Sequence, residues 1–181
     1  MKTSLLAAFL LATALRLSAD EVPARVHELA RTELAALAAD PALVSAVAAQ
    51  NARGLTLDQI KAEDKQWMAT AGTAGFMKAI IDSPLGNHLR AWRKARPYVA
   101  EIIVMDHQGA NVAITEKTSD YWQGDEPKFS ESFKDGGVVF VDRVKFDDST
   151  QTYSVQVSVP VRDAAGAAIG VICCGFDIEQ L

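Results

Sequence analysis

Residues 97–106 read Pro-Tyr-Val-Ala-Glu-Ile-Ile-Val-Met-Asp, and the hydrophobic pattern of the chain changes at this stretch. Before Pro97 the apolar residues recur at intervals of three and four, which indicates amphipathic helices. After Pro97 they alternate or form short apolar runs, which indicates strands. The sequence therefore predicts an α+β fold, with a helical region over residues 20–97 and a sheet over residues 98–181.

The helical region is predicted to begin with one long amphipathic helix that ends near Asp40. The next helix is expected to start at Pro41, because aspartate caps helices and proline is tolerated in the first turn. A third helix is expected after Thr56, since Thr56 and Gln59 have the spacing of a capping box. Further short helices follow until Pro97 ends the pattern.

Five strands are predicted in the sheet region. Their expected ranges are 98–105, 111–115, 138–146, 152–161 and 167–177. Short turns rich in aspartate and glycine join three of the four successive pairs, which favours an antiparallel sheet. The exception is the polar connection over residues 116–137. A connection of this length is uncommon in a compact domain unless it has a function.

The predicted turn at residues 147–150 closes a hairpin in which Phe140 lies opposite Val157. Their face is apolar apart from Asp142, and we expect it to pack on the long helix. The opposite face is mixed and carries Val139, Val141, Arg143, Ser154, Gln156 and Ser158. A slip of one residue would exchange these partners. The alternative for the mixed face is exposure to solvent.

The connection contains Tyr121 and Trp122, two large rings in a segment without helical or strand periodicity. If the connection folds over the mixed face, these rings wall a small cavity. Apolar walls with a few polar groups are typical of small-molecule sites. The predicted ligand-binding residues are Tyr121, Trp122, Asp125, Arg143, Gln156 and Ser158. The alternatives are that the rings only anchor the connection or that they form a protein-contact hot spot.

The first nineteen residues read as a secretory signal peptide, cleaved after Ala19. Its apolar run from Leu5 to Leu15 is too short to span about 30 Å of hydrocarbon, which disfavours an uncleaved anchor. Removing Lys2 and Arg16 changes the formal net charge from −5 to −7. An acidic product of this kind is not expected to bind nucleic acid or anionic membranes. We therefore predict a periplasmic or secreted protein with no stable membrane span.

Enzyme motifs are missing from the sequence. It contains no nucleophile elbow, no zinc-protease helix motif and no phosphate-binding loop, so we predict a protein without catalysis or cofactor. The adjacent Cys173 and Cys174 are expected in the core. The histidines are expected at the surface. If the protein is an enzyme after all, the alternative candidates for acid/base work are the acidic residues of the connection, Asp120, Asp125 and Glu126.

On these residues the chain resembles an extracytoplasmic single Cache domain, the PAS-like (PDC) sensor module. The stretches that carry the resemblance are residues 97–106, Thr-Ser-Asp-Tyr-Trp-Gln-Gly-Asp-Glu at 118–126, Tyr-Ser-Val-Gln-Val-Ser-Val-Pro-Val at 153–161, Ile-Gly-Val at 169–171 and Gly-Phe-Asp-Ile at 175–178. The resemblance implies a five-stranded antiparallel sheet with the long helix on one face. It also implies a ligand pocket on the other face, closed by the connection.

The resemblance further implies a small-metabolite ligand, often a carboxylate or an amino acid, that is bound without chemical change. Because the sequence ends at Leu181 without a signalling domain, a membrane receptor or sensor kinase is the expected partner. The alternative is an interaction protein that docks on such a receptor and has no small ligand of its own.

Overall fold

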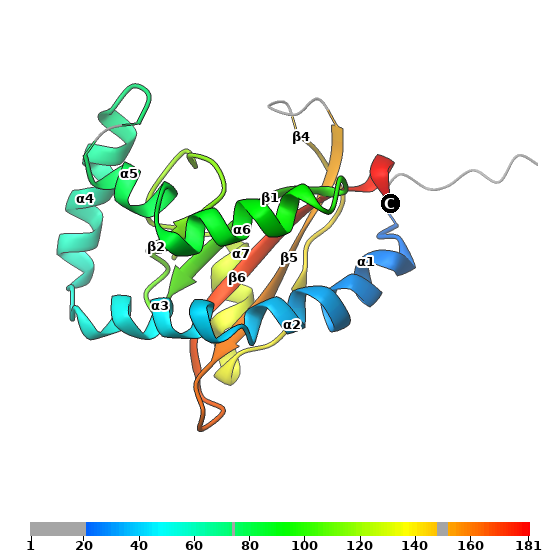
Figure 1. Cartoon of the computed structure of the whole chain (residues 1–181), viewed down its shortest axis with the longest axis horizontal. Coiled ribbons are helices and arrows are strands. Elements are labelled where there is room, and N and C mark those ends of the chain that lie inside the picture. Colours follow the sequence, from blue (N-terminus) through cyan, green and yellow to red (C-terminus); the bar gives the residue numbers. More distant parts are fainter. Residues whose placement is uncertain (1–20, 74, 148–151) are drawn as a thin grey trace, which may run out of the picture.

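The computed structural model describes residues 21–73, 75–147 and 152–181, and Figure 1 shows their arrangement. The predicted signal peptide and most of the predicted turn at 147–150 lie outside the described residues. The helices are α1 (Ala24–Leu29), η1 (Ala30–Leu34), α2 (Ala35–Ala38), α3 (Pro41–Ala52), α4 (Leu57–Ala69), α5 (Phe76–Ile81), α6 (Pro84–Lys94), α7 (Pro127–Phe133), η2 (Lys134–Gly136) and η3 (Ile178–Gln180). The strands are β1 (Val99–Asp106), β2 (Asn111–Ile114), β3 (Phe140–Val141), β4 (Lys145–Asp147), β5 (Thr152–Arg162) and β6 (Ala168–Asp177).

The helix starts follow the predicted capping chemistry. The Asp40 carboxylate accepts a hydrogen bond from the Ala42 amide at 2.8 Å and caps α3. Thr56 and Gln59 form a capping box at the start of α4. The predicted long first helix is confirmed as the continuous run α1–η1–α2. Among the described residues, no single helix has the length and apolar composition needed to cross a membrane.

The sheet is antiparallel, with the order β2-β1-β6-β5-β3, and β4 also pairs with β5. The α+β class is therefore confirmed. The predicted third strand is divided into β3 and β4, both on the same side of β5. This division explains why six strands stand where the sequence predicted five.

The predicted register of this third strand was wrong. Phe140 pairs with Ser158 and Val141 pairs with Val157, one residue away from the predicted partners. Residues 142–144 lie outside both strands, and from Val141 to Lys145 the chain takes four steps while β5 takes three. One extra residue on one strand is a β-bulge, and it exchanges the faces of the side chains around it.

The exchange moves predicted residues to the other face; Val139, for example, lines a groove beside α2 and α3 and not the mixed face. Val141 packs against the core beneath the long helix, although the sequence placed it on the mixed face. Asp142, predicted on the apolar face, instead lines a cavity on the mixed face.

The sheet separates two apolar clusters. The first lies between the sheet and helices α1–α3 and α6, and it receives Val155, Val157 and Val159 of β5 as predicted. The second lies on the other face, where α4, α5 and the connection meet β1 and β6. Cys173 and Cys174 are both buried free thiols, as predicted, and they belong to opposite clusters. Because successive side chains of a strand point to opposite faces, β5 and β6 each contribute residues to both apolar clusters.

Candidate functional site

The connection folds over the sheet face opposite the long helix, as predicted. Its second half forms α7, which packs on β5 and β6. Phe129 and Ser132 are buried beneath it, and the Ser132 hydroxyl donates a hydrogen bond to the Val138 carbonyl at 2.8 Å. The helix α7 was not predicted from the sequence. Its signals were Pro127 after Glu126 and the aromatic spacing of Phe129 and Phe133, which suit a helix start and one helix face.

Tyr121 lies in an aromatic cluster with Trp67 of α4 and Phe76 of α5, each ring centroid 5.8 Å from its own. Its side chain is buried, and its hydroxyl accepts a hydrogen bond from Gln50 Nε2 at 3.1 Å. Burial and the nearby Glu63 raise the pKa of Tyr121 to about 12. This ring ties the connection to α4 and α5 and, through Gln50, to α3.

Trp122 is half-buried on the same loop. Its indole Nε1 donates to the Gln108 carbonyl at 2.8 Å, and Lys61 Nζ lies 4.6 Å from its ring centroid. Asp64 of α4 accepts hydrogen bonds from the backbone amides of Tyr121 and Trp122 at 2.8 and 3.1 Å. Both aromatic residues therefore anchor the connection to α4.

The polar residues of the site stand in a row across the strands. Gly175 of β6 pairs with Glu101 of β1 on one side and with Gln156 of β5 on the other. Gln156 Nε2 donates to Glu101 Oε1 at 3.0 Å, so the two side chains bridge over the glycine. A Cβ at position 175 would lie 2.9 Å from Glu101 Cγ. Glycine at this position leaves the room that the bridge needs.

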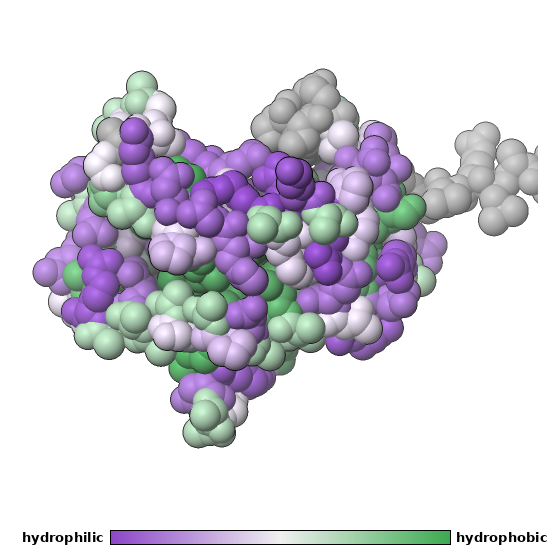
Figure 2. All heavy atoms as spheres, in the orientation of Figure 1, coloured by the Kyte–Doolittle hydropathy of each residue, from purple (hydrophilic) through white to green (hydrophobic). Residues whose placement is uncertain are grey.

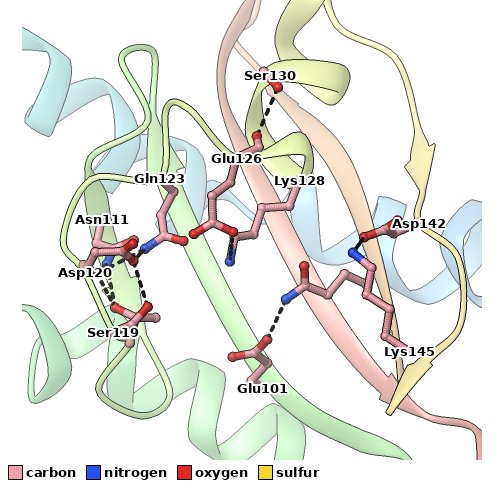
Figure 3. A network of polar contacts seen from close by, with 12 residues as sticks. Glu101, Asn111, Ser119, Asp120, Gln123, Glu126, Lys128, Ser130, Asp142 and Lys145 are labelled. Carbon is pink, nitrogen blue, oxygen red and sulfur yellow. Dashed lines mark hydrogen bonds and ion pairs between the residues drawn. The ribbon is translucent and has the colours of Figure 1, made fainter. Parts of the chain in front are cut away.

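Lys128 of α7 reaches into this face, and Figure 3 shows it between Glu126 and the side chain of Glu101. Its side chain is 9% exposed, and its Nζ lies 2.9 Å from Glu126 Oε2. Burial alone would lower the pKa of Lys128, but Cys173, Glu126 and Glu101 outweigh it and the pKa is raised. The site therefore contains a buried ammonium at neutral pH.

Ser158 lies in the next row and pairs across the sheet with Cys173. The Ser158 hydroxyl is fully buried; among the described residues it has no oxygen or nitrogen hydrogen-bond partner, and its contact with the Cys173 thiol is a weak one. Burial raises the pKa of the Cys173 thiol to about 12, with the nearby Lys128 acting in the opposite direction. Cys173 is thus a protonated, unreactive thiol at neutral pH. The Ser158 hydroxyl therefore retains capacity for a further hydrogen bond.

A cavity of about 310 Å³ opens beside this row. Arg143 and Lys145 bring positive charge to its wall, and Glu101 and Asp142 bring negative charge. Lys145 pairs with Asp142, whose carboxylate also accepts from the Arg143 amide at 2.8 Å. The residues that line the cavity are Glu101, Asp142, Arg143, Lys145, Phe146, Ser154 and Gln156.

A second polar cluster lies at the start of the connection, where Asn111, Asp120 and Gln123 meet (Figure 3). Asn111 Nδ2 and Gln123 Nε2 both donate to the Asp120 carbonyl, at 3.2 and 3.0 Å. Their amide oxygens are buried without partners in the described part of the chain. These hydrogen bonds tie Asp120 and Gln123 of the connection to Asn111 at the start of β2.

The six predicted ligand-binding residues do not all meet. Arg143 and Gln156 line the same cavity, and Ser158 is buried beside it. Tyr121 and Trp122 belong to the anchor on α4, and Asp125 is exposed. Glu101 and Lys128 were not predicted, and Glu126 was considered only as an alternative candidate for acid/base work. A lone carboxylate within the apolar run of residues 99–105 was the available signal for Glu101.

The described residues contain no group of three or more histidine, cysteine, aspartate or glutamate side chains that could hold a metal ion. The site combines one buried ammonium, two further cations and three carboxylates with a neutral amide and a hydroxyl. Such a set can orient a small polar molecule through charge-assisted hydrogen bonds.

No family model and no curated protein matches the chain. Solved structures do, at low identity. The sensor domain of the V. cholerae histidine kinase DctB has 15% identity and a TM-score of 0.43, covering 57% of this chain and 43% of that chain. The ligand-binding domain of the Campylobacter jejuni chemoreceptor Tlp3, in complex with 4-methylisoleucine, has 15% identity and a TM-score of 0.43, covering 86% and 56%.

The ligand-binding domain of the Pseudomonas fluorescens chemoreceptor CtaA, in complex with L-serine, has 13% identity and a TM-score of 0.41, covering 56% and 45%. The chain thus spans about half the length of the solved chains that it matches. These neighbours are sensor and ligand-binding domains of kinases and chemoreceptors.

Proposed function

We propose that residues 20–181 form a single Cache-like sensor domain that binds a small carboxylate-bearing metabolite, such as an amino acid, and releases it unchanged. The ligand binds on the sheet face that residues 118–137 cover. In this proposal the chain is exported, and it reports the bound state to a membrane receptor or sensor kinase.

The carrying observation is the buried polar row beside the 310 Å³ cavity. A buried hydroxyl with only a weak partner is costly unless a ligand or water satisfies it, and Ser158, beside the Cys173 thiol, is such a hydroxyl. Arg143 offers a planar fork that suits a carboxylate. Glu101 can accept from an ammonium group, since it presents a carboxylate to the same cavity. A molecule with both charges therefore matches the wall better than a purely apolar one.

The test is a thermal-shift screen of amino acids and organic acids, followed by calorimetry of the best compound with Arg143→Gln. Losing one charge-assisted contact at a partly exposed site costs about 1–2 kcal/mol, so the variant is expected to bind about five- to thirtyfold more weakly. Arg25→Gln is the matched control, because Arg25 is an exposed arginine of α1 on the opposite side of the sheet.

Two results would reject the proposal. One is an unresponsive protein that native mass spectrometry also finds empty, which would favour docking on a receptor without a small ligand. The other is chemical conversion of the compound during incubation.

A further inference from the structure

A second feature, on the opposite face of the sheet from the proposed ligand site, is a pair of apolar grooves on the two flanks of α3. We propose that these grooves receive the α3 helix of a second copy of this chain, so that the protein forms a two-fold dimer through α3. The inference does not rest on the proposed ligand. It rests on the shape and the charge of this surface.

The first groove has a volume of about 810 Å³ and lies between the helices and the edge of β5. Its walls are apolar and include Ala38 and Val44 on one side and Val159 and Pro160 on the other. The second groove has a volume of about 630 Å³ and lies between α3 and α6. Both grooves share Ser45, which therefore marks the ridge between them.

The two grooves flank this ridge and are offset along α3. The first runs from Pro41 to Ala48, and the second runs from Ala42 to Arg53. A helix that crosses α3 obliquely over Ser45 would lie in one groove on each side. Oblique crossings are the common way in which helices pack ridges into grooves. Because the surface presents a ridge and the matching grooves together, two copies complement each other.

The ridge lacks charge. Residues 41–52 contain no acidic or basic residue, although such residues make up 23% of the chain. The side chains of Leu43 and Val47 turn into the core, while Ala42, Ser45 and Ala49 are exposed. Figure 2 shows this part of the surface as a pale green band with deeper green hollows along it, bordered by hydrophilic residues. Burying the band against a second copy removes apolar surface from water without desolvating a charge.

Charge at the groove rims sets the direction of the second helix. The second groove ends at Arg53, whose Nη1 bonds only to the Gln50 amide among the contacts of the described residues. Asp163 stands at the rim of the first groove beside Arg162, whose guanidinium donates to the carbonyls of Gly136, Gly137 and Gly166. An antiparallel crossing brings the second copy's Arg53 towards Asp163. A parallel crossing would instead bring two Arg53 side chains together, so we infer the antiparallel one.

Cross-linking of full-length Ser45→Cys protein tests the geometry. Because Ser45 lies at the crossing point, the introduced thiol faces the same thiol of the second copy. Mild oxidation is therefore expected to give a covalent dimer. The native thiols do not compete, since Cys173 and Cys174 are buried. Ala62→Cys is the control: it also places a thiol at an exposed helical position, but on α4 outside the interface, so mild oxidation is expected to give no covalent dimer.

Sedimentation equilibrium tests the energetics. Ala49→Arg buries a charge in the interface and is expected to weaken the dimer at least about tenfold, whereas Ala62→Arg leaves it unchanged. Melting temperatures of both variants show whether each chain is folded. The inference is overturned if the native protein stays monomeric up to about 1 mM. It is also overturned if the protein dimerises but Ser45→Cys fails to cross-link, or if Ala49→Arg dimerises as the native chain does.

Discussion

Tyr121 shows how one side chain can define a loop. Its ring fills the space between Trp67 and Phe76, and its hydroxyl reaches Gln50. Removing a buried ring costs about 3–5 kcal/mol, so Tyr121→Ala should lower the free energy of unfolding by that amount. Tyr121→Phe keeps the ring and should cost about 0.5–1.5 kcal/mol.

Trp122→Ala is the comparison, because Trp122 is half-buried and should cost less than Tyr121→Ala. Urea unfolding measures all three variants. Equal losses from both alanine variants would contradict the anchor described for Tyr121.

Alkaline pH should destabilise the protein through the same residue. The pKa of Tyr121 is raised to about 12 by burial, above the value of about 10 expected in the unfolded chain. Below pH 10 both states are protonated and the stability is fully present; between about pH 10 and 12 the unfolded state ionises first, and stability is lost. The buried Cys173 acts in the same direction from about pH 9.

The measurement is the free energy of unfolding from pH 8 to 11. Tyr121→Phe should flatten the decline, and Tyr153→Phe, which alters an exposed ring, should not. An unchanged slope in Tyr121→Phe would show that Tyr121 ionises without unfolding.

At the scale of the element, α7 is held by the ion pair between Lys128 and Glu126. Glu126→Gln leaves a buried ammonium without its carboxylate and should cost about 1–3 kcal/mol, less than a fully buried pair because Glu126 keeps contact with solvent. Lys128→Met fills the same space without charge and should be close to neutral in stability.

The pair of variants separates stability from binding. If Lys128 contacts the ligand, Lys128→Met should fold normally and lose the thermal shift. A large loss of stability in Lys128→Met, with Glu126→Gln unaffected, would contradict the account of α7.

The same scale shows what the sequence could predict. Helix starts at Pro41 and Leu57 follow from chemistry within four residues, and they were predicted correctly. The faces of β5 follow from simple alternation and were also correct. The register of β3 was wrong because it depends on a bulge at residues 142–144, and no local pattern specifies one extra residue. Arg143 and Gln156 could be predicted for one site. The position of Lys128 could not be predicted, because it depends on how α7 packs on the sheet.

At the scale of the whole molecule, two layers cover one sheet. The helical layer uses Glu33 of η1, which pairs with Arg96 and accepts a hydrogen bond from Tyr98 at 3.0 Å, and so ties the long helix to the start of β1. The other layer is the connection with its two anchors, on α4 and through α7. A ligand that binds the native state but not the unfolded chain raises the free energy of unfolding, by about 2.7 kcal/mol when the ligand concentration is a hundred times Kd.

The alternation of β5 has an optical consequence. Gln156 and Ser158 face the proposed site, while their neighbours Val155 and Val157 support the helices, so a shift of this strand reaches both layers. Trp92 reports on the helical side, where its ring stacks under Arg96 at 3.8 Å, and Trp67 and Trp122 report on the other. With Trp67 and Trp122 replaced by phenylalanine, the emission of Trp92 becomes a remote reading of what occupies the opposite face.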